Sequence, residues 1–284
     1  MITALSVRVP ERQRGIRALT GILRRDKVEI TTKRARGVSL RHIVYTSYSG
    51  EVRLEKADEA VGMQRDRLLC SDKLEFPPSS GYKRFSSAAF SARLCENFAL
   101  GVIASCKKAP ALRIAIYDPS AYCAELLPNL LERCDDVSIV TDCVEPYYCA
   151  ADRALSELGA AAVITRQRGV LSDRDFIIAP MTIKESLPVK NNAVLFTVSR
   201  PKIKIAGNIF SRYHFKMPNG FADIKPEELS EEYFCSALYT LGAQFELGSI
   251  LPLSAVSNTG TRDAKALAEF LDREIGERKQ VRNI

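Results

Sequence analysis

Short apolar runs alternate with one-sided helical patterns through the middle of the chain, from about residue 111 to 201. The runs are rich in Val, Ile and Ala and have few polar positions, as expected of strands buried on both faces. Buried strands that alternate with helices are typical of a parallel sheet with crossover helices. The predicted strands are Leu112–Tyr117, Val137–Thr141, Ala161–Thr165, Asp175–Ala179 and Ala193–Ser199.

The connections between these strands also carry helix signals. A helix is predicted from Ala121 to about Arg133, and Pro128 inside it should kink or shorten it. The next helix has Pro146 near its first turn and Gly159 just past its end, the usual asymmetry of helix punctuation. The link from the third strand to the fourth is short, so we expect its helix to be lost or reduced to a turn.

The residues before this region predict a smaller β-rich part. Val28–Lys33, His42–Ser47 and Glu51–Glu55 alternate or are β-branched, and the turn residues 48–50 predict a hairpin between the last two. A helix follows, capped by Ser86 or Ser87. Its apolar stripe is Phe90, Leu94, Phe98 and Val102.

The pattern changes again after Pro201. Helices are predicted from Lys225 to about Gly242 and from a cap at Thr261 onward. The predicted fold class is α/β: a Rossmann-like parallel-sheet domain preceded by a small α+β domain and followed by C-terminal helices. The predicted domains are 1–108, 109–205 and a helical segment 206–284 that packs back on the others.

Composition places the 284-residue chain among ordinary globular proteins. No apolar run is long enough to span a bilayer, and the first residues lack the order of a signal peptide, so we expect a cytoplasmic protein without a membrane partner. Its eight cysteines are scattered without a Cys-x-x-Cys pair, and there are only two histidines. No metal site is therefore predicted, and the cysteines are expected to be buried and reduced.

The formal charge is +7, and much of the excess lies between Arg8 and Arg41. A basic face of this kind can bind nucleic acid, which is one alternative function for the chain. Aromatic residues are not interleaved with the basic ones, so a stacking platform for single strands is not indicated. A solvated basic face is the simpler interpretation.

The residues that follow the predicted strands are the candidates for a binding site. Open α/β sheets bind ligands beyond the carboxyl ends of their strands. Asp118 and Ser120 follow the first strand, Asp142 and Cys143 follow the second, and Thr182 follows the fourth. We expect a ligand site in residues 117–122, 142–145 and 179–184. Asp118 and Ser120 could also be plain helix caps, and Asp142 a turn residue.

Residues 111–200 resemble the first part of a Rossmann-like dinucleotide-binding domain of the dehydrogenase type. The resemblance rests on Asp142 at the end of the second strand and on the run from Val170 to Pro180, with an aspartate before an apolar strand. It implies NAD(P) as the cofactor, with Asp142 on the adenosine ribose and the loop after the first strand on the pyrophosphate.

That loop departs from the family pattern. It should read Gly-x-Gly-x-x-Gly, but residues 117–122 are Tyr-Asp-Pro-Ser-Ala-Tyr, without glycine. Asp118 would repel a phosphate, and Pro119 has no N–H to donate. We therefore predict that the chain kept the fold and lost or altered dinucleotide binding, acting through an oligomer or a protein partner. The alternative is an NAD(P)-dependent oxidoreductase with a divergent site for a nucleotide or small molecule.

Two further chemistries could use the same edge. Cys143 as a nucleophile needs a base beside it, and His42 and His214 both lie in other segments. A phospho-acceptor domain needs an aspartate after the third strand, where Thr165 is followed by Arg and Gln. The two main hypotheses differ in one observable: an open polar cleft supports cofactor binding, whereas side chains such as Tyr117 and Tyr122 filling the edge support the cofactor-free scaffold.

Overall fold

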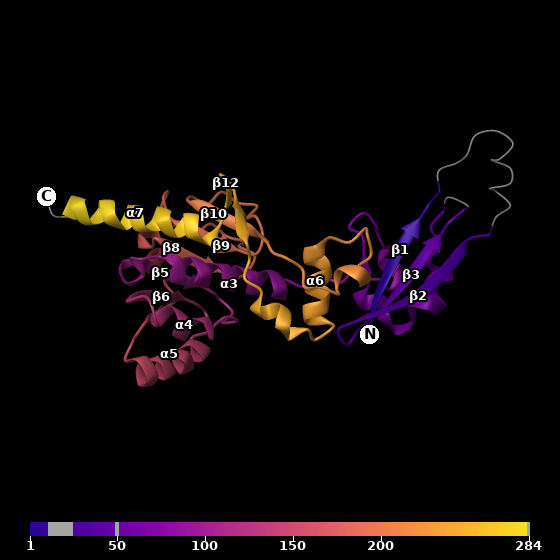
Figure 1. Cartoon of the computed structure of the whole chain (residues 1–284), viewed down its shortest axis with the longest axis horizontal. Helices are drawn as coiled ribbons and strands as arrows, with labels where there is room; N and C mark the ends of the chain where they lie inside the picture. The colour runs from indigo at the N-terminus through magenta and orange to yellow at the C-terminus, as the bar shows by residue number, and fades with distance from the viewer. Residues whose placement is uncertain (11–24, 49–50, 283–284) are drawn as a thin grey trace. The chain divides into compact units, whose positions relative to one another are not determined.

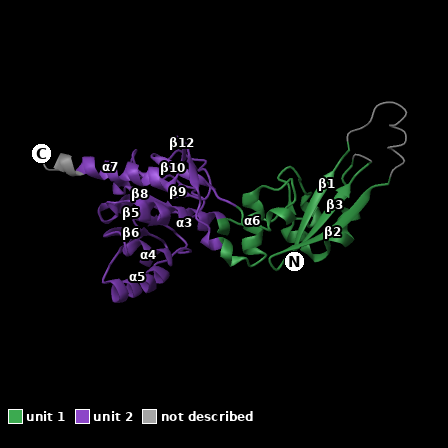
Figure 2. Ribbon diagram, viewed as in Figure 1, with its two compact units in different colours: residues 1–90, 217–247 green, residues 91–216, 248–284 purple. Residues whose placement is uncertain are grey.

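The computed structural model describes residues 1–10, 25–48 and 51–282, and the chain forms two compact units. Unit 1 comprises residues 1–90 and 217–247, and unit 2 comprises residues 91–216 and 248–284 (Figure 2). These limits differ from the predicted boundaries at 108 and 205. Most of the helix before residue 108 belongs to unit 2, and the C-terminal part is divided between the units.

Unit 1 contains a four-stranded sheet in the order β2-β3-β1-β4 (Figure 1). β1 runs parallel to β3 and to β4, whereas β2 and β3 form an antiparallel hairpin. The strands are β1 (Ile2–Arg8), β2 (Lys27–Ala35), β3 (Val38–Thr46) and β4 (Leu69–Cys70).

The hairpin turn is Arg36-Gly37, and both residues have positive φ, at 48° and 79°. Two such residues in succession match the right-handed twist of the flanking strands. The predicted hairpin was therefore wrong: it joined His42–Ser47 to Glu51–Glu55, whereas β3 pairs with the preceding strand β2. Its turn residues 49–50 lie outside the described residues, and Glu51–Arg53 forms no strand but leads into the 3₁₀ helix η1 (Leu54–Ala57). An arginine with positive φ gives no turn signal in a sequence, whereas Ser-Gly does.

The core of unit 1 lies between its sheet and short helices. Leu5, Ile43 and Tyr45 of the sheet pack with residues of η1 and of α2 (Asp58–Val61). Helix α6 (Glu231–Thr240) joins the unit through hydrogen bonds from Tyr233 Oη to the Phe85 carbonyl (3.0 Å) and from Ser236 Oγ to the Ser87 carbonyl (3.1 Å). It begins later than predicted because Ser230 is extended and caps it, accepting from Tyr233 N at 3.3 Å.

Unit 2 contains an eight-stranded sheet in the order β12-β11-β10-β9-β8-β5-β6-β7. The strands β5 to β10 are parallel, and β11 and β12 extend the sheet antiparallel. In chain order the parallel strands stand 3-2-1-4-5-6, which is the order of the dinucleotide-binding doubly wound fold. Unit 2 is Rossmann-like. Its strands are β5 (Arg113–Tyr117), β6 (Asp136–Val140), β7 (Val163–Thr165), β8 (Phe176–Ala179), β9 (Val194–Thr197), β10 (Asn208–His214), β11 (Ser254–Ser257) and β12 (Gly260–Arg262).

One face of this sheet packs against the helix predicted by the Phe90 stripe. Phe196 is fully buried, and its ring centroid lies 5.7 Å from Phe98, 5.0 Å from Phe176 and 5.4 Å from Phe210. Cys106, at the end of the Phe98 helix, donates to Asp272 of the last helix (3.1 Å). The helices of unit 2 are α3 (Ala89–Ser105), α4 (Leu126–Leu131), α5 (Glu145–Leu158) and α7 (Ala264–Arg282).

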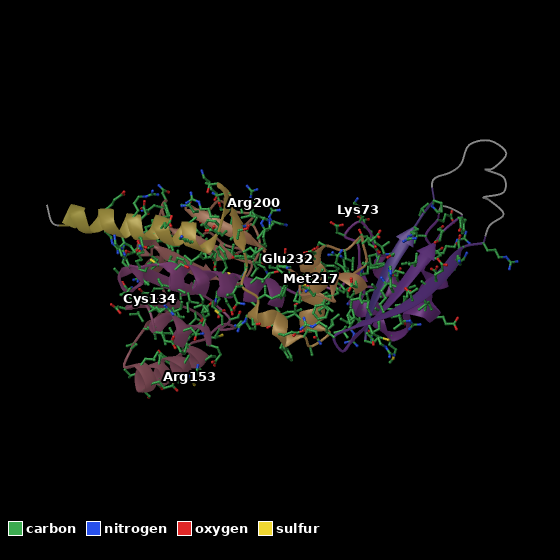
Figure 3. All side chains as sticks on the ribbon, in the orientation of Figure 1. Lys73, Cys134, Arg153, Arg200, Met217 and Glu232 are labelled. Carbon is green, nitrogen blue, oxygen red and sulfur yellow. The ribbon has the colours of Figure 1, made fainter. Side chains whose placement is uncertain are left out.

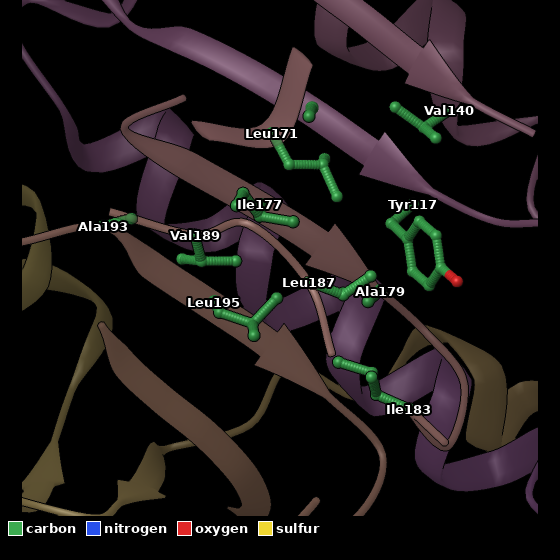
Figure 4. Packing of buried hydrophobic residues seen from close by; sticks show 11 residues of the cluster. Tyr117, Val140, Leu171, Ile177, Ala179, Ile183, Leu187, Val189, Ala193 and Leu195 are labelled. Carbon is green, nitrogen blue, oxygen red and sulfur yellow. The ribbon is translucent and has the colours of Figure 1, made fainter. Parts of the chain in front are cut away.

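The other face of the sheet is covered by connections rather than by long helices. Leu171 of the 3₁₀ helix η5 (Arg168–Asp173) packs there, which confirms the predicted loss of a helix between the third and fourth strands. Ile183, Leu187 and Val189, between β8 and β9, complete the cluster with Tyr117 (Figure 4). These side chains bury the middle of the sheet up to the end of β5.

The C-terminal part was predicted to be helical, but it also contains the strands β10, β11 and β12. Polar residues interrupt β10, and β11 and β12 are short, so the sequence pattern does not predict these strands. Helix α7 begins after Asp263, whose Oδ1 accepts from Ala266 N at 2.8 Å, while the predicted cap Thr261 lies in β12. Among the described residues, no helix is both long and apolar enough to cross a membrane.

Candidate functional site

The carboxyl edge of the parallel sheet in unit 2 holds all the site residues predicted from the sequence. Asp118 and Ser120 follow β5, Asp142 and Cys143 follow β6, and Thr182 follows β8. The strand order changes direction between β5 and β8, and such a switch point is where open α/β sheets bind ligands. The structure therefore places the five candidates at the carboxyl edge of the sheet, and their role in binding stays a prediction.

Hydrogen bonds link the loops that carry these residues in pairs. Asp142 N donates to the Pro119 carbonyl (3.2 Å), so the loops after β5 and β6 are in direct contact. Thr182 Oγ1 instead lies 3.1 Å from Ser199 Oγ, which links the loops after β8 and β9. The five candidates thus divide into two local groups along the edge.

Asp118 is the best-connected residue of the edge, and it is only 2% exposed. One of its carboxylate oxygens, Oδ2, accepts three hydrogen bonds. They come from Cys123 N (2.8 Å), Cys123 Sγ (3.1 Å) and Tyr147 Oη (3.0 Å). Cys123 lies in the same loop and Tyr147 in the first turns of α5, so the carboxylate joins the loop to a helix 29 residues away.

The donors around Asp118 keep their protons over the physiological range. Burial, reinforced by the negative charge of Asp118, raises the pKa of the Cys123 thiol well above its usual range. Burial and the neighbouring Cys123 and Asp118 do the same to the pKa of the Tyr147 hydroxyl. Burial also raises the pKa of Glu96 on α3, where Arg93 at 2.8 Å partly offsets the effect.

The loop after β5 uses its own backbone donors. The amides of Asp118, Ala121 and Cys123 donate to Val140 O (3.0 Å), Asp118 O (3.2 Å) and the Asp118 carboxylate (2.8 Å). Pro119 has no N–H. In the Gly-x-Gly-x-x-Gly spacing, Asp118, Ser120 and Cys123 stand at the three glycine positions, so two of them bond to each other where a pyrophosphate would approach.

The same loop explains why α4 is shorter than the predicted helix from Ala121 to Arg133. Ala121 has φ +55°, a left-handed value that cannot begin a helix. The bond from Cys123 N to the Asp118 side chain holds the next residues in a turn, and α4 begins only at Leu126. A six-residue helix that starts this late carries little of the dipole that stabilises a phosphate.

Tyr117, at the end of β5, closes the next part of the edge. It is 2% exposed, and its hydroxyl donates to Glu185 Oε1 in the loop after β8. Glu185 Oε2 forms an ion pair with Arg168, which follows β7. Burial and Glu185 together raise the pKa of the Tyr117 hydroxyl above its usual range. Tyr117 thus fills the edge as the cofactor-free hypothesis expected, whereas Tyr122 is 89% exposed and does not.

The remaining candidates are exposed. Ser120, Asp142, Cys143 and Thr182 all face solvent in unit 2. Asp142 forms no ion pair within the described part of the chain. Cys143 and Cys149 are the two exposed thiols of the eight, so the expectation that the cysteines are buried was wrong for these two, although all eight are free.

Neither histidine forms a bond with Cys143 in the described part of the chain. His214 Nδ1 lies 3.1 Å from Ser254 Oγ, and His42 Nε2 lies 2.6 Å from Ser6 Oγ in unit 1. Within the described residues, neither histidine therefore serves as a hydrogen-bonded base for a Cys143 nucleophile. The described residues also contain no group of three or more His, Cys, Asp and Glu side chains that could hold a metal ion.

The basic N-terminal run, on which the nucleic-acid alternative rested, is only partly described. Residues 11–24 lie outside the described residues. Of the rest, Lys27 pairs with Glu29 (2.5 Å), Arg36 pairs with Glu246 (2.7 Å), and Lys33 donates to the Asp223 carbonyl (3.1 Å). Part of the basic excess is thus balanced within unit 1.

Sequence reasoning missed Cys123, Tyr147 and Glu185 as members of this edge. Cys123 carried a readable signal, since it stands at the third glycine position of the loop spacing. Tyr147 carried none, because an aromatic residue in the first turn of an amphipathic helix is usually only part of the core. Glu185 lies in a loop, and its contact with Tyr117 depends on tertiary packing.

Comparisons with known proteins find only weak similarities, so the fold assignment rests on the strand order. No family model and no curated protein matches the chain. Among solved structures, it is similar to Δ1-pyrroline-2-carboxylate reductase of Thermococcus litoralis, determined with NADH and L-proline, over 43% of this chain and 40% of that chain (14% identity, TM-score 0.29). It is also similar to L-tryptophan dehydrogenase from Nostoc punctiforme, over 98% and 90% of the two chains (11% identity, TM-score 0.33).

Proposed function

We propose that this protein is a binding protein on a Rossmann-like scaffold that does not hold a dinucleotide in the usual way. The observation that supports the proposal is the Asp118 carboxylate, which accepts the amide of Cys123 and the hydroxyl of Tyr147. An anion of the protein itself thus takes the donors that a pyrophosphate needs. The buried Tyr117 and its bond to Glu185 further close the edge.

The electrostatic consequence is simple. A pyrophosphate that approached the loop would meet a carboxylate rather than a set of free N–H groups, and like charges at short range repel. Binding would also require the Asp118 hydrogen bonds to break, and each buried donor left unpaired costs about 1–3 kcal/mol. Both effects oppose dinucleotide binding in this loop.

The test is a binding assay with the full chain and NAD, NADP, FAD and ATP. In wild type the loop after β5 should contribute no binding, whereas a ligand held there at 100 times its Kd would add about 2.7 kcal/mol to the free energy of unfolding. Asp118→Gly should gain measurable affinity for ADP and NAD, since it frees the Cys123 amide and removes the repulsion. The matched control is Asp135→Gly, an exposed loop aspartate that should gain nothing.

The proposal fails if wild type binds a dinucleotide as tightly as Asp118→Gly does. Asp118→Asn separates charge from shape, because the amide keeps the size of the carboxylate. If charge repulsion is the main barrier, Asp118→Asn should recover part of the affinity that Asp118→Gly gains.

A second candidate function is an NAD(P)-dependent oxidoreductase that holds the adenosine ribose and leaves the pyrophosphate outside the loop. It is favoured by Asp142, which is exposed after β6 and forms no ion pair in the described part of the chain. In this family of folds an acid at that position binds the ribose hydroxyls. Dinucleotide binding by wild type that disappears in Asp142→Ala would support this candidate over the first.

A further inference from the structure

A groove of about 630 Å³ lies on unit 2 beyond the carboxyl end of β9. Its lining comes from the segment that follows β9, from β10 and from residues 256–258 at the end of β11. β9 and β10 pair from Val194–Asn208 to Phe196–Phe210, and then β9 ends while β10 continues along β11. The register of β10 with β11 also shifts between Phe210 and Arg212. No residue of the loop after β5 lines the groove.

The lining of the groove carries three cations and no carboxylate. Arg200 (Figure 3), Lys204 and Arg212 line it and are all exposed. None of the three forms an ion pair within the described residues, in contrast with Arg113, Arg168 and Arg174 of the same unit, which all do. Three unbalanced positive charges around one hollow create a local potential that concentrates anions.

Neutral polar groups stand among these cations. Ser211 is 8% exposed, and its hydroxyl makes no hydrogen bond within the described part of the chain. Asn258 Oδ1 accepts from Ile209 N (3.3 Å), a bond that leaves the amide NH₂ of Asn258 available to an acceptor. Arginine, hydroxyl and amide donors are the groups that phosphate oxygens bind in proteins.

The remaining lining is apolar. Ile203, Ile205 and Ile209 are partly buried and pack against the cluster that contains Leu195. Val198 and Val256 extend this apolar wall. The volume falls within the range of small-molecule pockets, which combine apolar walls with a few convergent polar groups.

From this combination we infer that the groove between β9 and β10 binds a small organic phosphate. The phosphate contacts Arg200, Lys204 and Arg212, and the organic part lies against the isoleucines. A dianion suits three cations better than a carboxylate monoanion does, because the Coulomb attraction grows with the charge of the ligand. This site is separate from the closed loop after β5, so it extends the proposed function without depending on it.

The experiment uses the full chain and phenyl phosphate as the probe in calorimetry. Wild type should bind phenyl phosphate more tightly than inorganic phosphate or benzoate, and should not bind phenol. Binding should weaken at high salt, since exposed charges are screened. Arg212→Ala and Lys204→Ala should each weaken binding at least tenfold, whereas Lys184→Ala, which removes an exposed lysine outside the groove, should not change it.

A second variant tests the apolar wall. Val256→Thr keeps the side-chain volume but replaces a methyl group with a hydroxyl, so it should weaken phenyl phosphate binding and leave inorganic phosphate binding unchanged. The inference is overturned if the groove variants bind phenyl phosphate as Lys184→Ala does. It is also overturned if wild type binds a single-stranded oligonucleotide but no phenyl phosphate. Dinucleotide binding that depends on Asp142 would contradict only the proposed function, because the groove variants would not alter it.

Discussion

Asp175→Ala should lower the free energy of unfolding of unit 2 by about 3–5 kcal/mol, the usual cost of removing one partner from a buried ion-pair network. Asp175 lies just before β8 at the amino edge of the sheet, and its carboxylate is bound by Arg113, Lys190 and Arg278 (2.6 Å for Arg278). Its loss leaves three cations facing one another. The chain has no tryptophan, so urea unfolding is best followed by far-ultraviolet circular dichroism.

The same residue should give the protein an acid-sensitive step. Burial alone would raise the pKa of Asp175, but hydrogen bonds from Lys190 and Arg113 outweigh it and hold the pKa at about 2. A carboxyl whose pKa is lower in the folded state contributes stability above its unfolded pKa, and this contribution is lost as the pH falls toward the folded value. The free energy of unfolding of wild type should therefore fall by about 2 kcal/mol between roughly pH 4 and pH 2 because of Asp175.

Two variants separate this effect from general acid sensitivity. Asp175→Asn should be less stable than wild type at neutral pH and should lack the acid-dependent loss. Asp173→Asn is the control, since it removes the half-exposed partner of Arg113 (2.5 Å). It should lower the free energy of unfolding by only about 0–1 kcal/mol, as is usual for surface ion pairs. If Asp175→Asn and wild type show the same loss between pH 4 and pH 2, Asp175 is not its source.

Phe196→Ala should destabilise unit 2 by about 3–5 kcal/mol, as expected for an aromatic residue removed from a packed core. Phe196 is fully buried in β9, and its ring contacts Phe98, Phe176 and Phe210 at centroid distances of 5.7, 5.0 and 5.4 Å. Three aromatic neighbours from two strands and α3 cannot all move inward to fill the space. A residual cavity should therefore remain, and its lining loses dispersion contacts.

Hydrogen exchange measures this effect by position. Phe196→Ala should accelerate exchange throughout β8, β9 and β10, because these strands meet at the altered ring. Val163→Ala is the control, because Val163 lies in the edge strand β7 and is 58% exposed. Its effect on the free energy of unfolding should stay within about 0.5 kcal/mol. A Phe196→Ala protein as stable as Val163→Ala would contradict the central role of this aromatic cluster.

The parallel sheet could be predicted from the sequence because each strand is a short apolar run bounded by turn residues and helices. The pattern placed β5, β6, β7, β8 and β9 within a few residues of their positions. It did not reveal β10 to β12, since Ser211 and Arg212 interrupt the apolar pattern and β12 is entirely exposed. It also misplaced the hairpin, because only the three-dimensional pairing shows that Arg36 has positive φ.

The candidate site could be placed but not understood from the sequence. Parallel strands end at one edge, so Asp118, Asp142 and Thr182 had to lie there. The sequence also showed that the loop after β5 lacks glycine. What it could not show is that Asp118 bonds to Cys123 and Tyr147, because such a bond depends on how the loop folds back and on how α5 packs beside it. The groove between β9 and β10 was equally hidden, since its lining comes from separate segments of the chain that only the folded sheet brings together.

The division of each unit into two stretches of chain has a consequence for biosynthesis. During translation the strands of the unit 1 sheet emerge first, but α6, which supplies the buried Phe234 and Leu238, emerges only after β10 of unit 2. Residues 217–247 lie in the chain between β10 and β11, which then pair, with Leu253 N bonded to His214 O at 2.7 Å. We therefore expect a nascent chain stopped after β10 to hold an exposed, incomplete core that a chaperone would bind, and the completed chain to be released from it only after β11 has left the ribosome.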